Sequence, residues 1–236
     1  MSVEVFRVDS VSKAFGGRSV LKAASFWAWE GRITALLGRN GSGKSTLLRV
    51  AVGEVGARGG VVRYLSEAYE RPRLALLARR GLYYLEERAR LPNTFSIRVH
   101  LELICKKFGG QPLDEVVAGL ELEDLLEKKV HECSEGEARR AALAAAVVRA
   151  PRCLLADEPF MGIAPKDEAM VAAALRDLAA RGTAIVTTGH EVPALLRTAD
   201  EVIWCVAGTT HGLGPPQEAQ SHPEFVRDYL GWQSQG

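Results

Sequence analysis

Hydrophobic and polar residues alternate through the first thirty positions, as they do in strands that are buried on one face. The alternation is clearest over residues 3–5, 20–21 and 26–29, and turns at 16–17 and 30–31 separate these runs. The N-terminal pattern therefore predicts strands of a small antiparallel sheet.

Three later runs are mainly apolar, which is typical of parallel strands buried on both faces. They cover Ile33–Leu37, Cys153–Ala156 and Ala184–Thr188. Two other short runs, at 59–65 and 81–85, also predict strands. Each of the three apolar runs is followed closely by polar residues, so the functional chemistry is expected where these strands end.

Between these strands the apolar residues recur at helical spacing. Helices are predicted over 44–52, 72–79 and 167–180, and the stretch 95–150 is mainly helical. Alternating strands and helices predict an α/β core into which the helical stretch is inserted as a subdomain. The expected boundaries are about 1–30 and 58–66 for the antiparallel β subdomain, about 31–57, 67–94 and 151–210 for the core, about 95–150 for the helical subdomain and about 211–236 for a C-terminal tail.

Composition excludes several classes of protein. Of the 236 residues, 25% are charged and the formal net charge is +1, which gives no general electrostatic reason to expect a nucleic-acid partner. The longest apolar stretch, 141–148, is less than half of a membrane span, and the N-terminus lacks a signal-peptide pattern. The four cysteines form no CxxC pair. We therefore expect a cytoplasmic protein with reduced thiols.

A phosphate-binding loop follows the first apolar run. Residues 38–45 fit the pattern G-x-x-x-x-G-K-[ST] between a predicted strand and a predicted helix, which is the context this motif needs. The backbone N–H groups and the helix N-terminus are expected to bind phosphate oxygens. Lys44 is expected to reach the β- and γ-phosphates of ATP, and Ser45 to ligate Mg²⁺. The residues predicted to bind the nucleotide here are Gly38, Asn40, Gly41, Ser42, Gly43, Lys44, Ser45 and Thr46.

Two carboxylates and a histidine follow the other apolar runs. Asp157 suits a Mg²⁺ shell and Glu158 suits a general base that polarises the attacking water. His190 is placed to contact the γ-phosphate or to hold the water, although a histidine at a strand end can also be structural. An acidic pair can likewise do no more than cap a strand, and the nearby phosphate loop favours the catalytic interpretation.

In this order and spacing, the chain resembles the ATP-binding subunit of ABC transporters over nearly its whole length. The resemblance includes Phe15 in an early turn, the signature-like segment Cys133-Ser134-Glu135-Gly136-Glu137, and Asp157-Glu158-Pro159. It implies a P-loop NTPase core of ABC type. Residues near the C-terminus are similar to the compact subunits that serve branched-chain amino-acid uptake and lipopolysaccharide export.

The resemblance also implies roles that the residues alone do not. Phe15 is expected to stack on adenine, and Ser134 and Gly136 to contact the ATP of a second subunit in a head-to-tail dimer. Glu87 stands where the family has a glutamine that ligates the metal. The dimer is expected to drive transmembrane permease subunits from the cytoplasmic side of the membrane, with no nucleic acid as partner.

Four positions depart from the family pattern. Glu135 replaces a glycine of the signature and Cys133 a leucine, Glu87 replaces the glutamine, and Ala164 replaces an aspartate. A carboxylate at 135 has the wrong charge to approach a γ-phosphate. The groups that act on the chain's own ATP are retained, apart from Glu87, whereas those serving a partner's site are altered.

These departures leave two interpretations open for the dimer and two for the activity. A heterodimer would supply an intact signature from the partner, whereas a homodimer would have two slow sites. The chain is predicted to be an ATPase coupled to transport, and the alternative is a regulatory subunit that binds nucleotide with little turnover. A third interpretation, an ABC protein acting on nucleic acid or ribosomes, would call for two tandem ATPase domains, and the sequence contains one.

Overall fold

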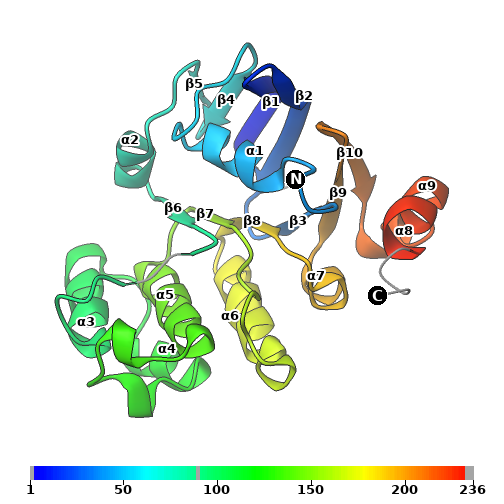
Figure 1. The fold of residues 1–236 in the computed structure, drawn as a ribbon. Helices are drawn as coiled ribbons and strands as arrows, with labels where there is room; N and C mark the ends of the chain where they lie inside the picture. Colours follow the sequence, from blue (N-terminus) through cyan, green and yellow to red (C-terminus); the bar gives the residue numbers. More distant parts are fainter. Residues whose placement is uncertain (1–2, 89–90, 232–236) are drawn as a thin grey trace.

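The computed structural model describes residues 3–88 and 91–231, which form two β-sheets flanked by helices (Figure 1). The smaller sheet is antiparallel, with strand order β2-β1-β4-β5. Its strands are β1 (Glu4–Phe15), β2 (Arg18–Trp29), β4 (Val61–Tyr64) and β5 (Glu67–Tyr69). The predicted antiparallel sheet is therefore present, but the runs at 20–21 and 26–29 belong to one long strand rather than to two.

The larger sheet has six strands in the order β10-β9-β3-β8-β7-β6. All neighbours pair in parallel except β9 and β10, which form an antiparallel hairpin at one edge. The strands are β3 (Ile33–Leu37), β6 (Leu82–Leu85), β7 (Cys153–Ala156), β8 (Ala184–Thr188), β9 (Glu201–Val206) and β10 (Thr209–Gly214). β10 crosses position 211, where the C-terminal tail was expected to begin, and the division into subdomains stays a prediction.

Helices cover both faces of the larger sheet. In Figure 1, α1 lies between the two sheets, and α5, α6 and α7 lie on the opposite side of the larger sheet. The α-helices are α1 (Lys44–Ala51), α2 (Leu74–Arg79), α3 (Ile97–Phe108), α4 (Leu113–Gly119), α5 (Glu135–Arg149), α6 (Glu168–Ala180), α7 (Val192–Thr198), α8 (Pro216–Ala219) and α9 (Pro223–Phe225). Short 3₁₀ turns at Glu123–Leu125, Val130–Glu132 and Pro165–Asp167 and a π-helix at Val226–Leu230 complete the fold.

The central strands are buried because each contributes alternate side chains to two apolar cores. Ile33 and Leu37 of β3 pack in the core beneath α5, α6 and α7, whereas Leu36 packs in the core shared with α1 and the antiparallel sheet. Leu154 and Leu155 of β7 divide in the same way. Burial on both faces explains why these strands are mainly apolar in sequence.

No described helix is both long and apolar enough to cross a membrane. All four cysteines are free thiols, and Cys153 and Cys205 are buried in the larger sheet.

Candidate functional site

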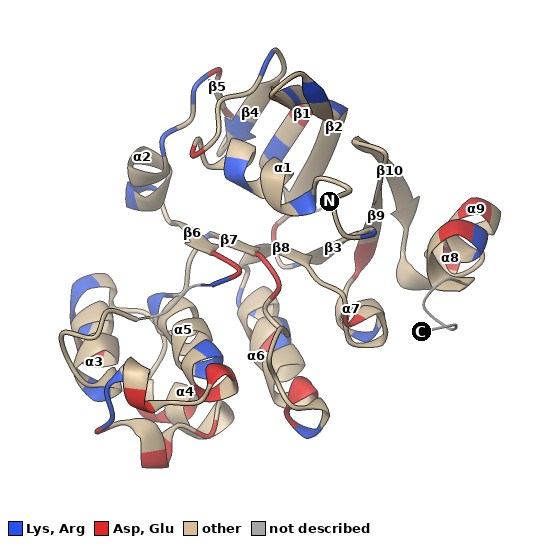
Figure 2. Cartoon of the chain, in the orientation of Figure 1, with Lys and Arg blue, Asp and Glu red and all other residues tan. Residues whose placement is uncertain are grey.

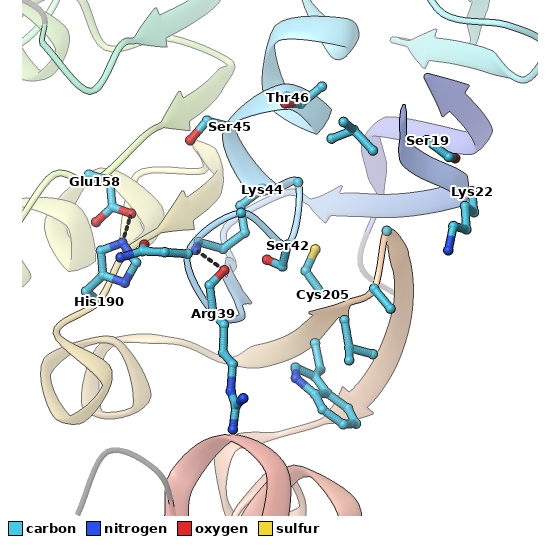
Figure 3. Close-up of a pocket in the computed structure, with 18 of the residues that line it drawn as sticks. Ser19, Lys22, Arg39, Ser42, Lys44, Ser45, Thr46, Glu158, His190 and Cys205 are labelled. Carbon is cyan, nitrogen blue, oxygen red and sulfur yellow. Dashed lines mark hydrogen bonds and ion pairs between the residues drawn. The ribbon is translucent and has the colours of Figure 1, made fainter. Parts of the chain in front are cut away.

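The ends of three adjacent strands bring the predicted site residues together. β3, β8 and β7 lie side by side and parallel, so their carboxyl ends meet at one edge of the sheet. The phosphate loop follows β3, Asp157 and Glu158 follow β7, and His190 follows β8. A cavity of about 920 Å³ opens there, and most of the loop, together with Glu87, Glu158 and His190, lines it (Figure 3).

The phosphate loop needs glycine at two close approaches. A Cβ on Gly38 would lie 2.3 Å from the carbonyl oxygen of Cys205 in β9. Gly43 has φ +107°, in the left-handed region, and a Cβ there would lie 2.8 Å from Cδ2 of Leu21. Gly43 is the N-cap of α1 and supplies no side-chain cap, so the first N–H groups of the helix face the cavity uncapped by a side chain.

Lys44 lies within this loop and is 5% exposed. Its Nζ donates to the carbonyl oxygen of Gly38 at 2.8 Å and to that of Arg39 at 3.5 Å. Figure 3 shows the contact with Arg39. Burial lowers the pKa of Lys44, while the carboxylates of Glu158 and Asp157 act in the opposite direction. The loop therefore places a cation and backbone N–H groups at the same cavity wall, which fits a polyphosphate.

Asp157 links the phosphate loop to β8. Its Oδ1 accepts hydrogen bonds from Ser45 Oγ at 3.1 Å and from Thr188 Oγ1 at 2.6 Å. Burial raises the pKa of Asp157, and these two hydrogen bonds oppose that shift. Among the described residues no three His, Cys, Asp and Glu side chains gather closely enough to hold a metal ion by themselves. The hydroxyl and carboxylate nevertheless fit Mg²⁺, which takes few protein ligands beside phosphates and water.

Glu158 is held in an uncommon backbone conformation, with φ +55°. Its N–H donates to Thr188 Oγ1 at 3.0 Å, and Oε1 lies 3.1 Å from Nε2 of His190. The other oxygen, Oε2, is buried and accepts no hydrogen bond from the described residues. Burial raises the pKa of Glu158 to about 7. Burial, followed by the charge of Lys44, lowers the pKa of His190.

Five residues of the predicted set are not among those that line this cavity: Gly38, Asp157, Phe15, Ser134 and Gly136. Gly38 and Asp157 contact the lining residues Lys44 and Ser45. Phe15, the last residue of β1, is 48% exposed, and Lys13 Nζ lies 4.9 Å from its ring centroid. Ser134 and Gly136 lie at the N-terminus of α5, where the Ser134 hydroxyl accepts a hydrogen bond from the N–H of Glu137 at 3.3 Å. The signature-like segment therefore forms a capped helix start outside the cavity that contains Lys44 and Glu158.

The altered residue Glu135 packs against the loop that follows β7. A Cβ on Gly162 would lie 3.1 Å from Cγ of Glu135, so the stem of this side chain covers Gly162. Glu135 remains exposed. Ala164 follows two residues later and is the N-cap of a 3₁₀ turn, to which its side chain contributes no hydrogen bond.

The structure adds three residues that the sequence did not identify. Thr188 at the end of β8 contacts both Asp157 and Glu158. The sequence feature that could have identified it is its position at the end of a strand, directly before a glycine. Arg139 of α5 is 4% exposed and donates to backbone carbonyls beside the site. Asp228 of the C-terminal π-helix also lines the cavity, and no sequence signal pointed to it.

In the parallel sheet, β3 leads into the phosphate loop, and a nearby strand, β7, ends at Asp157-Glu158. This arrangement defines a P-loop nucleotide-binding protein. Sequence comparison makes the class more specific. A family model described as "ABC transporter" matches residues 21–161. The chain belongs to this family as an ATP-binding domain, and the predicted P-loop core of ABC type is confirmed.

Individual relatives agree with this assignment. The zinc import ATP-binding protein ZnuC of Halorhodospira halophila is 30% identical over 231 residues, which cover 94% of this chain and 82% of that protein. The lipopolysaccharide export system ATP-binding protein LptB of Acidithiobacillus ferridurans is 29% identical, with 98% and 99% covered. A solved nucleotide-free ATP-binding cassette from an ABC transporter shares the fold, with TM-score 0.81, 23% identity, and 96% and 99% covered.

Proposed function

We propose that this protein is the ATP-hydrolysing subunit of an ABC transporter, and that it energises separate membrane subunits through ATP-driven closure of a dimer. The observation that carries this proposal is that a cation, a buried carboxylate and an exposed histidine paired with it all lie at one cavity. Lys44 supplies the cation, and Glu158 and His190 supply the pair. Family membership supports the ATPase class.

The reaction proposed is in-line attack of water on the γ-phosphate of ATP. Lys44 and the N-terminus of α1 bind the phosphates, and Ser45 and Asp157 hold Mg²⁺, with Glu87 at the cavity wall as a further oxygen ligand. Mg²⁺, when bound, neutralises charge on the phosphate oxygens. Glu158 orients the water and accepts its proton at a carboxylate oxygen, and His190 contacts the γ-phosphate or holds the water.

The dimer completes the site. Ser134 and Gly136 lie outside the chain's own cavity at an exposed helix start, which supports their contacting ATP bound to a second subunit. Phe15 presents an exposed ring, which supports stacking on adenine. The altered Glu135 on that same exposed surface favours a heterodimer, in which a partner with an intact signature completes this chain's site.

The partners proposed are transmembrane permease subunits, and the place of action is the cytoplasmic face of the cell membrane. No nucleic-acid partner is proposed, because Lys and Arg are interspersed with Asp and Glu over the outer helices (Figure 2). The relatives are named for zinc import and for lipopolysaccharide export, so their names do not agree on a substrate or a direction.

The alternative is a nucleotide-binding subunit of low ATPase activity within a heterodimeric ABC complex, and the altered Glu135 and Ala164 favour it. Steady-state hydrolysis by the purified chain, with and without a co-purified permease complex, distinguishes the two. For an ATPase, Glu158→Gln lowers turnover by about 100-fold or more, as expected for loss of a general base, while MgADP affinity is retained. A wild-type rate no higher than that of Glu158→Gln in both settings would favour the regulatory role.

A further inference from the structure

One arginine connects the signature-like helix to the backbone of the general base. Arg139 lies in the first half of α5 and is 4% exposed. Its Nη2 donates to the carbonyl oxygen of Asp157 at 2.7 Å and also to that of Glu158. Its Nη1 donates to the carbonyl oxygen of Glu86 at 2.8 Å. A single guanidinium therefore binds the backbone of two loops, one after β6 and one after β7.

These contacts stabilise the uncommon backbone conformation of Glu158. A non-glycine residue at φ +55° persists only when its surroundings hold it there. Thr188 accepts from the N–H of Glu158, and Arg139 donates to its carbonyl oxygen, so both peptide groups of Glu158 are fixed. A hydrogen bond from a charged donor is stronger than a neutral one, and the planar guanidinium reaches several acceptors at once.

The environment of Arg139 acts on its charge in two opposite ways. Burial lowers the pKa of its guanidinium, while the carboxylates of Asp157, Glu158 and Glu87 act in the opposite direction. Lys44 has different acceptors, because its Nζ donates to the carbonyl oxygens of Gly38 and Arg39. Arg139 thus touches the backbone that carries the catalytic carboxylate without belonging to the phosphate loop.

We propose that Arg139 is a positioning residue for ATP hydrolysis. Through its guanidinium, α5 fixes the backbone of Glu158 so that the carboxylate stays against His190, and the start of α5 is thereby connected to the general base. This inference rests on the hydrolysis proposed above. It predicts that disturbing Arg139 affects turnover far more than nucleotide affinity.

Arg149 offers a matched control on the same helix. It donates to the backbone carbonyls of Leu82, at 2.8 Å, and Ala78, so it also ties α5 to the core, but its acceptors lie away from the cavity. Lysine and methionine variants are made at both positions. The quantities compared are kcat for ATP, the dissociation constant of MgADP by calorimetry, and the thermal midpoint.

Arg139→Lys and Arg139→Met are expected to lower kcat by about 10- to 100-fold, as small displacements of a catalytic group do. The MgADP dissociation constant is expected to stay within about threefold, because the phosphate loop is untouched. The Arg149 variants are expected to lower the thermal midpoint with little change in kcat. If Arg139→Met does not fold, the comparison is made between Arg139→Lys and Arg149→Lys. Equal loss of kcat at both positions would overturn the positioning role.

A double-mutant cycle with Glu158→Gln separates action through the carboxylate from a general effect. Because Arg139 acts through Glu158, Arg139→Lys is expected to change the residual single-turnover rate of Glu158→Gln by less than about twofold. If Arg139→Lys lowers the rate of Glu158→Gln by as large a factor as it lowers the wild-type rate, the proposal is overturned. If the wild-type chain with its permease complex does not hydrolyse ATP, both the proposed activity and the positioning role of Arg139 are overturned. If the wild type hydrolyses ATP and the Arg139 variants do so at the same rate, only the positioning role is overturned.

Discussion

Replacing Glu158 by glutamine is expected to stabilise the protein, and to do so more strongly at alkaline pH. The residue is 5% exposed, and burial raises the pKa of its carboxyl group from 4.5 to about 7. The folded state therefore binds the proton more tightly than the unfolded state. Ionisation costs no stability below about pH 4.5, costs progressively more as the pH rises towards 7, and reaches its full cost above 7. Glutamine keeps the shape of the side chain and has no charge to bury.

The size of the effect follows from the shift. Each pKa unit corresponds to about 1.4 kcal/mol, so the rise from 4.5 to about 7 costs about 3 kcal/mol at pH 8 and about 1 kcal/mol at pH 5. Glu158→Gln is therefore expected to increase the free energy of unfolding by about 2 kcal/mol more at pH 8 than at pH 5.

Urea unfolding of the nucleotide-free protein in EDTA, at both pH values, measures this difference. Glu123→Gln is the control, since Glu123 is an exposed carboxylate of a 3₁₀ turn far along the chain from the site. It makes the same change from glutamate to glutamine at an exposed position. A stabilisation by Glu158→Gln that differs by less than about 0.5 kcal/mol between pH 5 and pH 8 would refute the reasoning.

Three other substitutions test the rest of the site. Lys44→Ala is expected to weaken MgADP binding by about 10- to 100-fold in calorimetry, because it removes a charged hydrogen-bond donor to phosphate; unchanged affinity would argue against the loop as the phosphate site. Thr188→Val is expected to lower the free energy of unfolding by about 1–3 kcal/mol in urea, because Asp157 loses a buried donor and the N–H of Glu158 its acceptor, and a neutral result would contradict that network. Glu135→Gly is expected to raise ATP turnover if the carboxylate obstructs the partner's site, and an unchanged rate would remove that explanation.

The strands that position the site could be predicted because burial determines their sequence. Ile33–Leu37, Cys153–Ala156 and Ala184–Thr188 were predicted with the bounds that the structure has. Each lies between two apolar cores, which favours apolar residues at most positions, although Thr34, Thr187 and Thr188 are also buried there. The positions of Asp157 and His190 followed from the same pattern.

The two long N-terminal strands were harder to predict because bulges break their alternation. The register of β1 against β2 shifts between Val8 and Val11 and again between Val11 and Lys13. Ser10 and Ala23 have positive φ values of 51° and 54°, a conformation that one type of bulge uses. Each shift moves the following side chains to the other face, so a simple period of two covered only fragments of each strand.

Contacts between distant segments could not be predicted from local patterns. Arg139 lies four residues before Leu143 and so on the buried stripe of α5, where a charge indicates a partner, yet nothing in the sequence identified three backbone carbonyls as that partner. Asp228 reaches the cavity only because the C-terminal segment packs back against the sheet. Such placements depend on the complete fold.

The departures from the family pattern other than Glu87 share one surface. Glu135 packs on Gly162, Ala164 follows two residues later, and Cys133 precedes the same helix start. The groups that hold the chain's own phosphates lie instead around Lys44. Because the two sets are separate in space, a change at Glu135 has no direct route to the phosphate loop. Glu135→Gly is therefore expected to leave MgADP affinity unchanged.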